Sequence, residues 1–99
     1  MVLSWFDAGK AKEFGVSLAL FFTERIPSTS QKSDKVFEQK ADKILNQMAD
    51  QVVRFKREEK LNAYKKAQLG NAFKWALRDA GFAPEYTDKL TKWLMLQIS

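Results

Sequence analysis

The sequence predicts an all-α fold of four helices, arranged as a four-helix bundle or a compact helical array with a hydrophobic first helix. Apolar residues recur at spacings of three and four along most of the chain, which is the period of an amphipathic helix. Proline, glycine and clusters of small polar residues interrupt this pattern where helices would end. Residues 14–22 carry one hydroxyl as their only polar side chain, which predicts a helix buried by neighbours on several sides.

A single domain spanning residues 1–99 is expected. A chain of this length buries roughly 60–65% of its unfolded surface, which is enough for one core. Hydrophobic residues make up 45% of the sequence and include eight Phe and three Trp. Such a chain has enough apolar surface to fold by itself.

The first helix is expected over residues 4–25. Ser4 is a suitable N-cap, because its hydroxyl can accept a hydrogen bond from an unpaired backbone amide. Pro27 and the serine-rich segment after it predict the end of this helix. Ala8, Gly15 and Ala19 have little side-chain bulk, so they predict a position where a neighbouring helix approaches closely.

The second and third helices are expected over residues 34–60 and 62–80. The second has an apolar stripe at helical spacing, formed by Phe37, Ala41, Ile44, Leu45, Met48, Val52 and Phe55. If this helix continued, polar residues would occupy the stripe, whereas the apolar residues from Leu69 onward lie about a quarter-turn away. A break near Leu61 follows, with Asn62 as the N-cap of the third helix.

The fourth helix is expected over residues 84–97. Gly81 can adopt the left-handed conformation that ends the third helix, and Phe82 can pack back on Leu77 as in a Schellman motif. Pro84 suits the first position of the next helix, and Glu85 adds an acidic group to its first turn.

Composition argues against most catalytic and metal-dependent functions. The chain has no cysteine and no histidine, so it lacks thiolate nucleophiles and the commonest metal ligand and general base. We therefore expect no enzyme activity, no cofactor and no metal site. Residues 14–22 are too short to span a bilayer, and the acidic Asp7 and Glu13 are atypical of a secretory signal, so a cytoplasmic protein is expected.

The expected function is non-catalytic binding of another protein or of a second copy of this chain. The first and fourth helices carry apolar side chains that lie off their main stripes. This apolar surface is larger than three amphipathic neighbours would cover. A two-fold dimer would bury such a patch from both copies. The residues expected to self-associate are Val16, Leu20, Met95, Leu96 and Ile98.

Nucleic-acid binding is the alternative. The chain carries a net charge of +5, and the segment from Arg54 to Arg78 contains eight basic residues and only two acidic ones. Aromatic residues are interleaved there, so phosphate contacts could combine with base stacking. The candidate basic surface consists of Arg54, Arg57, Lys60, Lys65, Lys66, Lys74, Trp75 and Arg78.

Overall fold

The computed structural model describes residues 7–26 and 35–99, with side chains from residue 39 onward in the second range. These residues form four helices and no strand: α2 (Gly9–Arg25), α3 (Lys35–Glu58), α4 (Ala63–Asp79) and α5 (Pro84–Ile98). The predicted all-α fold is confirmed. The predicted N-cap at Ser4, the turn after Pro27 and the helix start at Asp34 lie outside the described residues.

The helix ends follow the local sequence signals. The Asn62 side chain accepts a hydrogen bond of 2.8 Å from the backbone N–H of Lys65, which confirms it as the N-cap of α4. Gly81 has a φ of 96°, and the N–H of Phe82 donates to the carbonyl of Leu77 at 3.2 Å, as in the predicted Schellman motif. Pro84 is the first residue of α5.

The predicted start of the first helix is wrong. Asp7 and Ala8 precede α2, which begins at Gly9. The Asp7 carboxylate accepts a hydrogen bond from the N–H of Gly9 at 3.2 Å. It therefore satisfies an unpaired amide at the start of the helix instead of lying in its first turn.

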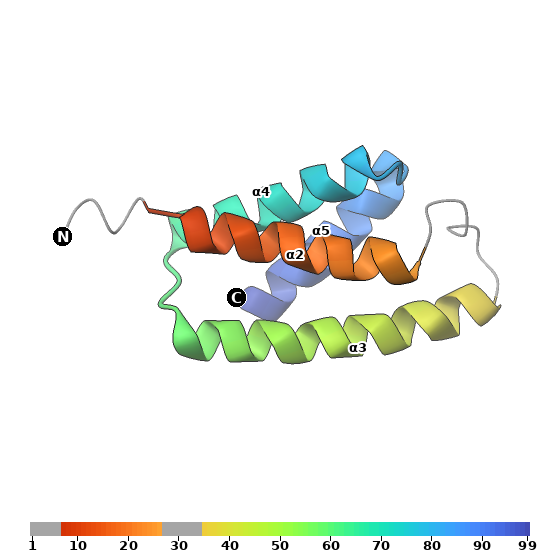
Figure 1. The fold of residues 1–99 in the computed structure, drawn as a ribbon, viewed down its shortest axis with the longest axis horizontal. Coiled ribbons are helices and arrows are strands. Elements are labelled where there is room, and N and C mark those ends of the chain that lie inside the picture. Colours follow the sequence, from red (N-terminus) through yellow and green to blue (C-terminus); the bar gives the residue numbers. More distant parts are fainter. Residues whose placement is uncertain (1–6, 27–34) are drawn as a thin grey trace.

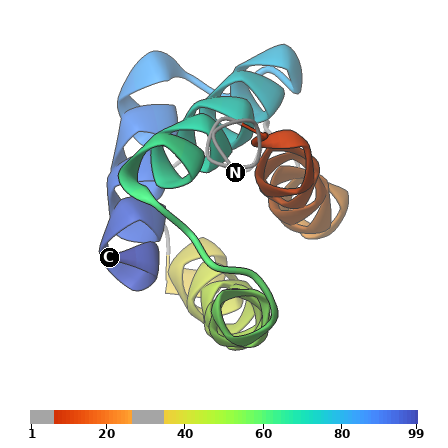
Figure 2. The ribbon, with the colours of Figure 1, turned by 90° about the vertical axis from the view of Figure 1, so that its left-hand side faces the viewer.

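The most extensive helix contact joins α2 and α4, which are not consecutive in sequence. The two run in the same direction, while α3 and α5 run the opposite way (Figure 1). Viewed along the bundle, α4 lies between α2 and α5, and α3 lies across from α4 (Figure 2). Consecutive helices thus reverse direction, as their short connections favour.

Small residues explain the close contact between α2 and α4. Gly15 is buried, and a Cβ atom there would overlap the backbone carbonyl oxygen of Leu69. Ala11 and Ala19 share the buried side of α2 and expose 2% and 0% of their surfaces. The predicted close approach is confirmed at Gly15, and the helix that approaches is α4. Of the other two small residues predicted there, Ala19 is buried on the same side of α2, and Ala8 is buried just before the helix begins.

One core joins all four helices. Its largest fully buried side chains include Phe22, Met48, Phe73, Leu77 and Leu94. The predicted stripe on α3 is confirmed at Ala41, Ile44, Met48 and Val52, which are buried, and at Leu45 and Phe55, which are half-buried against the core. The side chain of Phe37 lies outside the described residues.

The prediction that residues 14–22 are buried on several sides is wrong for part of the run. Leu18, Ala19 and Phe22 are fully buried, but Val16 and Leu20 are exposed. The reason is that α2 lies at one edge of the four helices, so the other described helices cover it on one side only (Figure 2).

Candidate functional site

The outer face of α2 carries an exposed apolar pair. Val16 and Leu20 lie one helical turn apart and expose 39% and 51% of their surfaces. At ~100° per residue, this pair points nearly opposite to Leu18 and Phe22, which enter the core. A shallow hollow runs over the pair and is bordered by Lys12, Glu13 and Ser17.

The remaining residues predicted for self-association lie on α5. Leu96 is 67% exposed, whereas Met95 is half-buried and its sulfur lies close to Gly70 of α4. Ile98 is fully buried, so its assignment to an exposed patch is corrected: it continues the core stripe of Leu90 and Leu94 at a spacing of four.

The structure does not join the two halves of this predicted set. α2 and α5 pack on different sides of α4 (Figure 2). The side chains that remain exposed therefore form two separate surfaces. One is the Val16–Leu20 pair, and the other is centred on Leu96.

The predicted basic surface does not lie on one face either. Arg54 and Arg57 are exposed on α3, and Lys60 lies in the connection to α4. Along α4, at ~100° per residue, the directions of Lys65 and Lys66 differ from that of Arg78 by more than a quarter-turn. Lys66 is half-buried, and Lys74 forms an ion pair with Asp88 at 3.6 Å.

Trp75 and Arg78 form a local pair within this segment. Trp75 is 51% exposed, and the Arg78 guanidinium carbon lies 5.2 Å from the centre of its ring. The indole N–H donates to the Asn71 side chain at 3.1 Å. The ring therefore already lies next to a cation, while about half of the residue is exposed to solvent.

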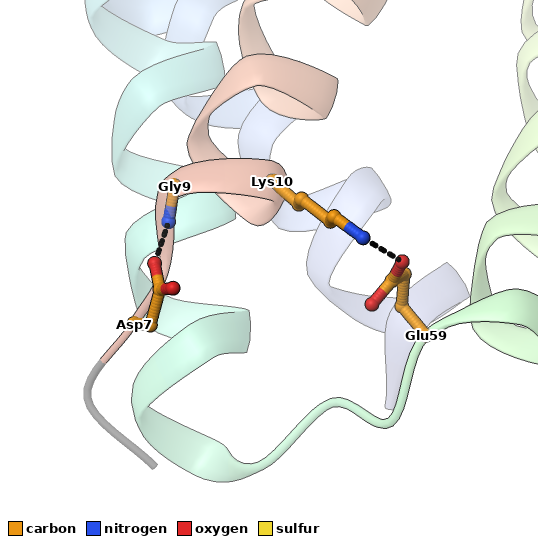
Figure 3. A network of polar contacts seen from close by, with 4 residues as sticks. All are labelled: Asp7, Gly9, Lys10 and Glu59. Carbon is orange, nitrogen blue, oxygen red and sulfur yellow. Dashed lines mark hydrogen bonds and ion pairs between the residues drawn. The ribbon is translucent and has the colours of Figure 1, made fainter. Parts of the chain in front are cut away.

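A second group of side chains meets at one end of the bundle. The first turn of α2, the last turn of α3 and the first turn of α4 come together there (Figures 1 and 3). Lys10 Nζ lies 3.2 Å from Glu59 Oε1, and the rings of Phe14 and Phe55 stack in parallel with their centres 4.1 Å apart. The pairing of Lys10 with Glu59 could not be predicted from the sequence, because residues 49 positions apart share no local signal.

Tyr86 is the one described residue whose ionisation is clearly perturbed. Burial beside Phe82 and Phe22, whose ring centres lie 5.6 Å and 6.2 Å away, raises the pKa of its phenol to about 12. The Tyr86 ring is thus packed with aromatic side chains of the core.

Within the described ranges, no group of three or more acidic side chains is placed to hold a metal ion. Among the same residues, no helix combines the length and apolar composition needed to cross a bilayer. Comparison of the chain with models of known protein families, with curated proteins and with solved structures finds no match.

Proposed function

We propose that this protein is a non-catalytic, cytoplasmic binding module that associates with a second copy of itself through the outer face of α2. The observation that supports this is the exposure of Val16 and Leu20, 39% and 51%, on the side of α2 that faces away from the core. The two side chains are adjacent on the helix and form one apolar surface. Burying that surface would remove it from water.

The charges beside the apolar pair favour a second copy as the partner. Lys12 and Glu13 point ~100° apart on α2, and Val16 and Leu20 lie between these two directions. In a parallel pair of α2 helices related by a two-fold axis, Lys12 of each copy would face Glu13 of the other. The patch is thus complementary to itself, as an interface between identical surfaces requires.

Sedimentation equilibrium from micromolar to millimolar protein tests this proposal. The parent chain should shift from monomer to dimer across that range, and Leu20→Asp should remain monomeric with an unchanged far-UV circular dichroism spectrum. Leu96→Asp is the matched control, since Leu96 is 67% exposed on another helix. The proposal would be contradicted by a parent chain that is monomeric at every concentration. It would also be contradicted if Leu20→Asp and Leu96→Asp weakened the dimer equally.

A charge swap tests the orientation of the two helices. Lys12→Glu should weaken the dimer, because it places two carboxylates in contact on each side of the two-fold axis. Adding Glu13→Lys to that variant should restore association, because the pair is then reversed in both copies. If the double variant is weaker than the single one, the parallel arrangement is wrong.

Nucleic-acid binding remains the alternative, and the exposed Trp75 with Arg78 beside it favours this function. It has less support, because the basic side chains of α4 point in different directions. A titration with mixed-sequence RNA and DNA at low salt decides it. Binding should quench tryptophan fluorescence, weaken steeply with added salt and be lost in Trp75→Ala.

A further inference from the structure

A hollow of about 180 Å³ lies at the end of the bundle where α2, α3 and α4 meet. Its apolar wall is formed by Ala11, Phe55 and Leu61. Its polar wall includes Lys10, Lys60 and Lys65, which come from three different parts of the chain. This hollow is separate from the proposed dimer surface, because Ala11 points nearly opposite to Val16 and Leu20 on α2, and the hollow shares no lining residue with the surface over that pair.

The charges around the hollow leave two ammonium groups available. The carboxylate of Glu59 pairs with Lys10 at 3.2 Å, and the carboxylate of Asp7 accepts the N–H of Gly9 at 3.2 Å (Figure 3). Lys60 and Lys65 form no ion pair with any described residue. With three lysines and two carboxylates, the lining has an excess of positive charge.

The excess of ammonium groups in the lining favours a small anion, because lysine ammonium groups bind phosphate as point charges. The N-terminus of α4 adds partial positive charge, whereas the Asp7 carboxylate already binds the first amide of α2 and the C-terminus of α3 adds partial negative charge, so the lysines carry the attraction. Pockets for drug-sized ligands are typically about 300–1,000 Å³, so this hollow suits a smaller molecule. Phe55 and Leu61 can contact a small apolar group attached to the anion.

We propose that this hollow binds a small phosphate compound, with Lys60 and Lys65 as the principal phosphate ligands. The phosphate is either the free inorganic ion or the head of a small monoester whose organic part packs on Phe55 and Leu61. The Lys10–Glu59 pair limits the affinity, since the Glu59 carboxylate repels an anion and engages the third lysine.

Titration of ¹⁵N-labelled protein with inorganic phosphate and with phenyl phosphate, at constant ionic strength, tests the site by NMR. Saturable shifts should be confined to the backbone amides of Ala11, Leu61, Lys65 and their neighbours. Tighter binding of phenyl phosphate would identify a monoester site, and equal affinities would identify a site for the free ion. Shifts that do not saturate, or that spread over the whole surface, would overturn the proposal.

Two matched pairs of variants separate a specific site from general charge attraction. Lys60→Gln/Lys65→Gln should weaken phosphate binding at least about tenfold, whereas Lys89→Gln/Lys92→Gln, with the same change in net charge, should leave it nearly unchanged. Glu59→Gln should tighten binding severalfold, because it removes a repelling carboxylate and releases Lys10. The exposed Glu85→Gln, on α5, should not tighten it.

Equal effects of the two members of either matched pair would show that phosphate is attracted only by the net charge of the protein, which would overturn the proposal. Circular dichroism of each variant establishes that it is folded, and substitution of these surface side chains should leave the core intact. The same titration in Leu20→Asp keeps the test independent of the proposed dimer. Phosphate binding should persist in that variant, because the hollow lies within one copy.

Discussion

Gly15→Ala should destabilise the fold although alanine is the better helix former. A Cβ atom at this position would overlap the carbonyl oxygen of Leu69 and lie 3.2 Å from the backbone nitrogen of Phe73. Both atoms belong to the backbone of α4, so no change of side-chain rotamer can make room. The two helices would have to separate, which opens the most extensive contact in the molecule.

The expected magnitude is the difference between two terms. Overpacking in a core costs ~1–3 kcal/mol, and a clash with backbone belongs at the upper end of that range. The gain in helix propensity offsets ~1 kcal/mol. We therefore expect Gly15→Ala to lower the free energy of unfolding by ~2 kcal/mol, which corresponds to a fall in Tm of roughly 8–16 °C for a domain of this size.

Two other glycines provide matched controls for this prediction. At Gly70, the added Cβ would meet the sulfur of Met95, the far end of a flexible side chain that can move aside. At Gly9, the nearest atom is a carboxylate oxygen of Asp7 at 3.4 Å, an ordinary contact. Gly70→Ala and Gly9→Ala should therefore stay within ~1 kcal/mol of the parent.

Equilibrium urea unfolding followed by far-UV circular dichroism measures all three variants. The protein concentration must be held constant, because association would shift the apparent stability. A Gly15→Ala variant that is as stable as Gly70→Ala would show that α2 and α4 are not held at the observed separation. The explanation of the α2–α4 contact would then be wrong.

The remaining stability predictions follow from burial. Leu18→Ala should lower the free energy of unfolding by ~2–5 kcal/mol, because Leu18 is fully buried. Phe21→Ala should lower it by less, because Phe21 is only half-buried. Equal losses of stability for the two variants in urea unfolding would contradict this order. Thr87→Val should stabilise by ~1 kcal/mol in thermal unfolding, because the Thr87 hydroxyl is buried without a hydrogen-bond partner among the described residues; a marked loss would reveal a partner. Burial raises the pKa of Tyr86 from its usual value of 10.0 to about 12 in the folded chain. Between these two pH values the unfolded chain releases a proton that the folded chain keeps, so the free energy of unfolding should fall as the pH rises. Tyr86→Phe should reduce that fall relative to the parent when urea midpoints at pH of about 9 and about 11 are compared.

The start of α4, the end of α4 and the start of α5 could be predicted because their causes are local. The Asn62 side chain binds an amide three residues away, and Gly81 supplies a backbone conformation that other residues rarely adopt. Pro84 lacks a backbone N–H, but at the first helical position such an N–H would have no partner within the helix. Each signal depends on a few consecutive residues, so it can be read without knowing which helices are neighbours.

The arrangement of the helices could not be predicted in the same way. Small residues on the first helix indicated a close neighbour, but nothing in a single sequence identified that neighbour as α4. The Lys10–Glu59 pair and the Phe14–Phe55 stack likewise depend on the packing of α2 against α3. Ile98 could have been assigned to the core, since it continues the spacing of Leu90 and Leu94, but its place in a cluster of terminal apolar residues concealed that periodicity.

The small residues of α2 connect the fold to the proposed dimer surface. Because Ala11, Gly15 and Ala19 must face α4, the rotation of the helix about its own axis is determined. With ~100° per residue, that rotation turns Val16 and Leu20 about 120° away from α4, and the pair is exposed because no other described helix covers that side of α2 (Figure 2). A variant therefore cannot bury the pair by turning α2 without losing the contact at Gly15.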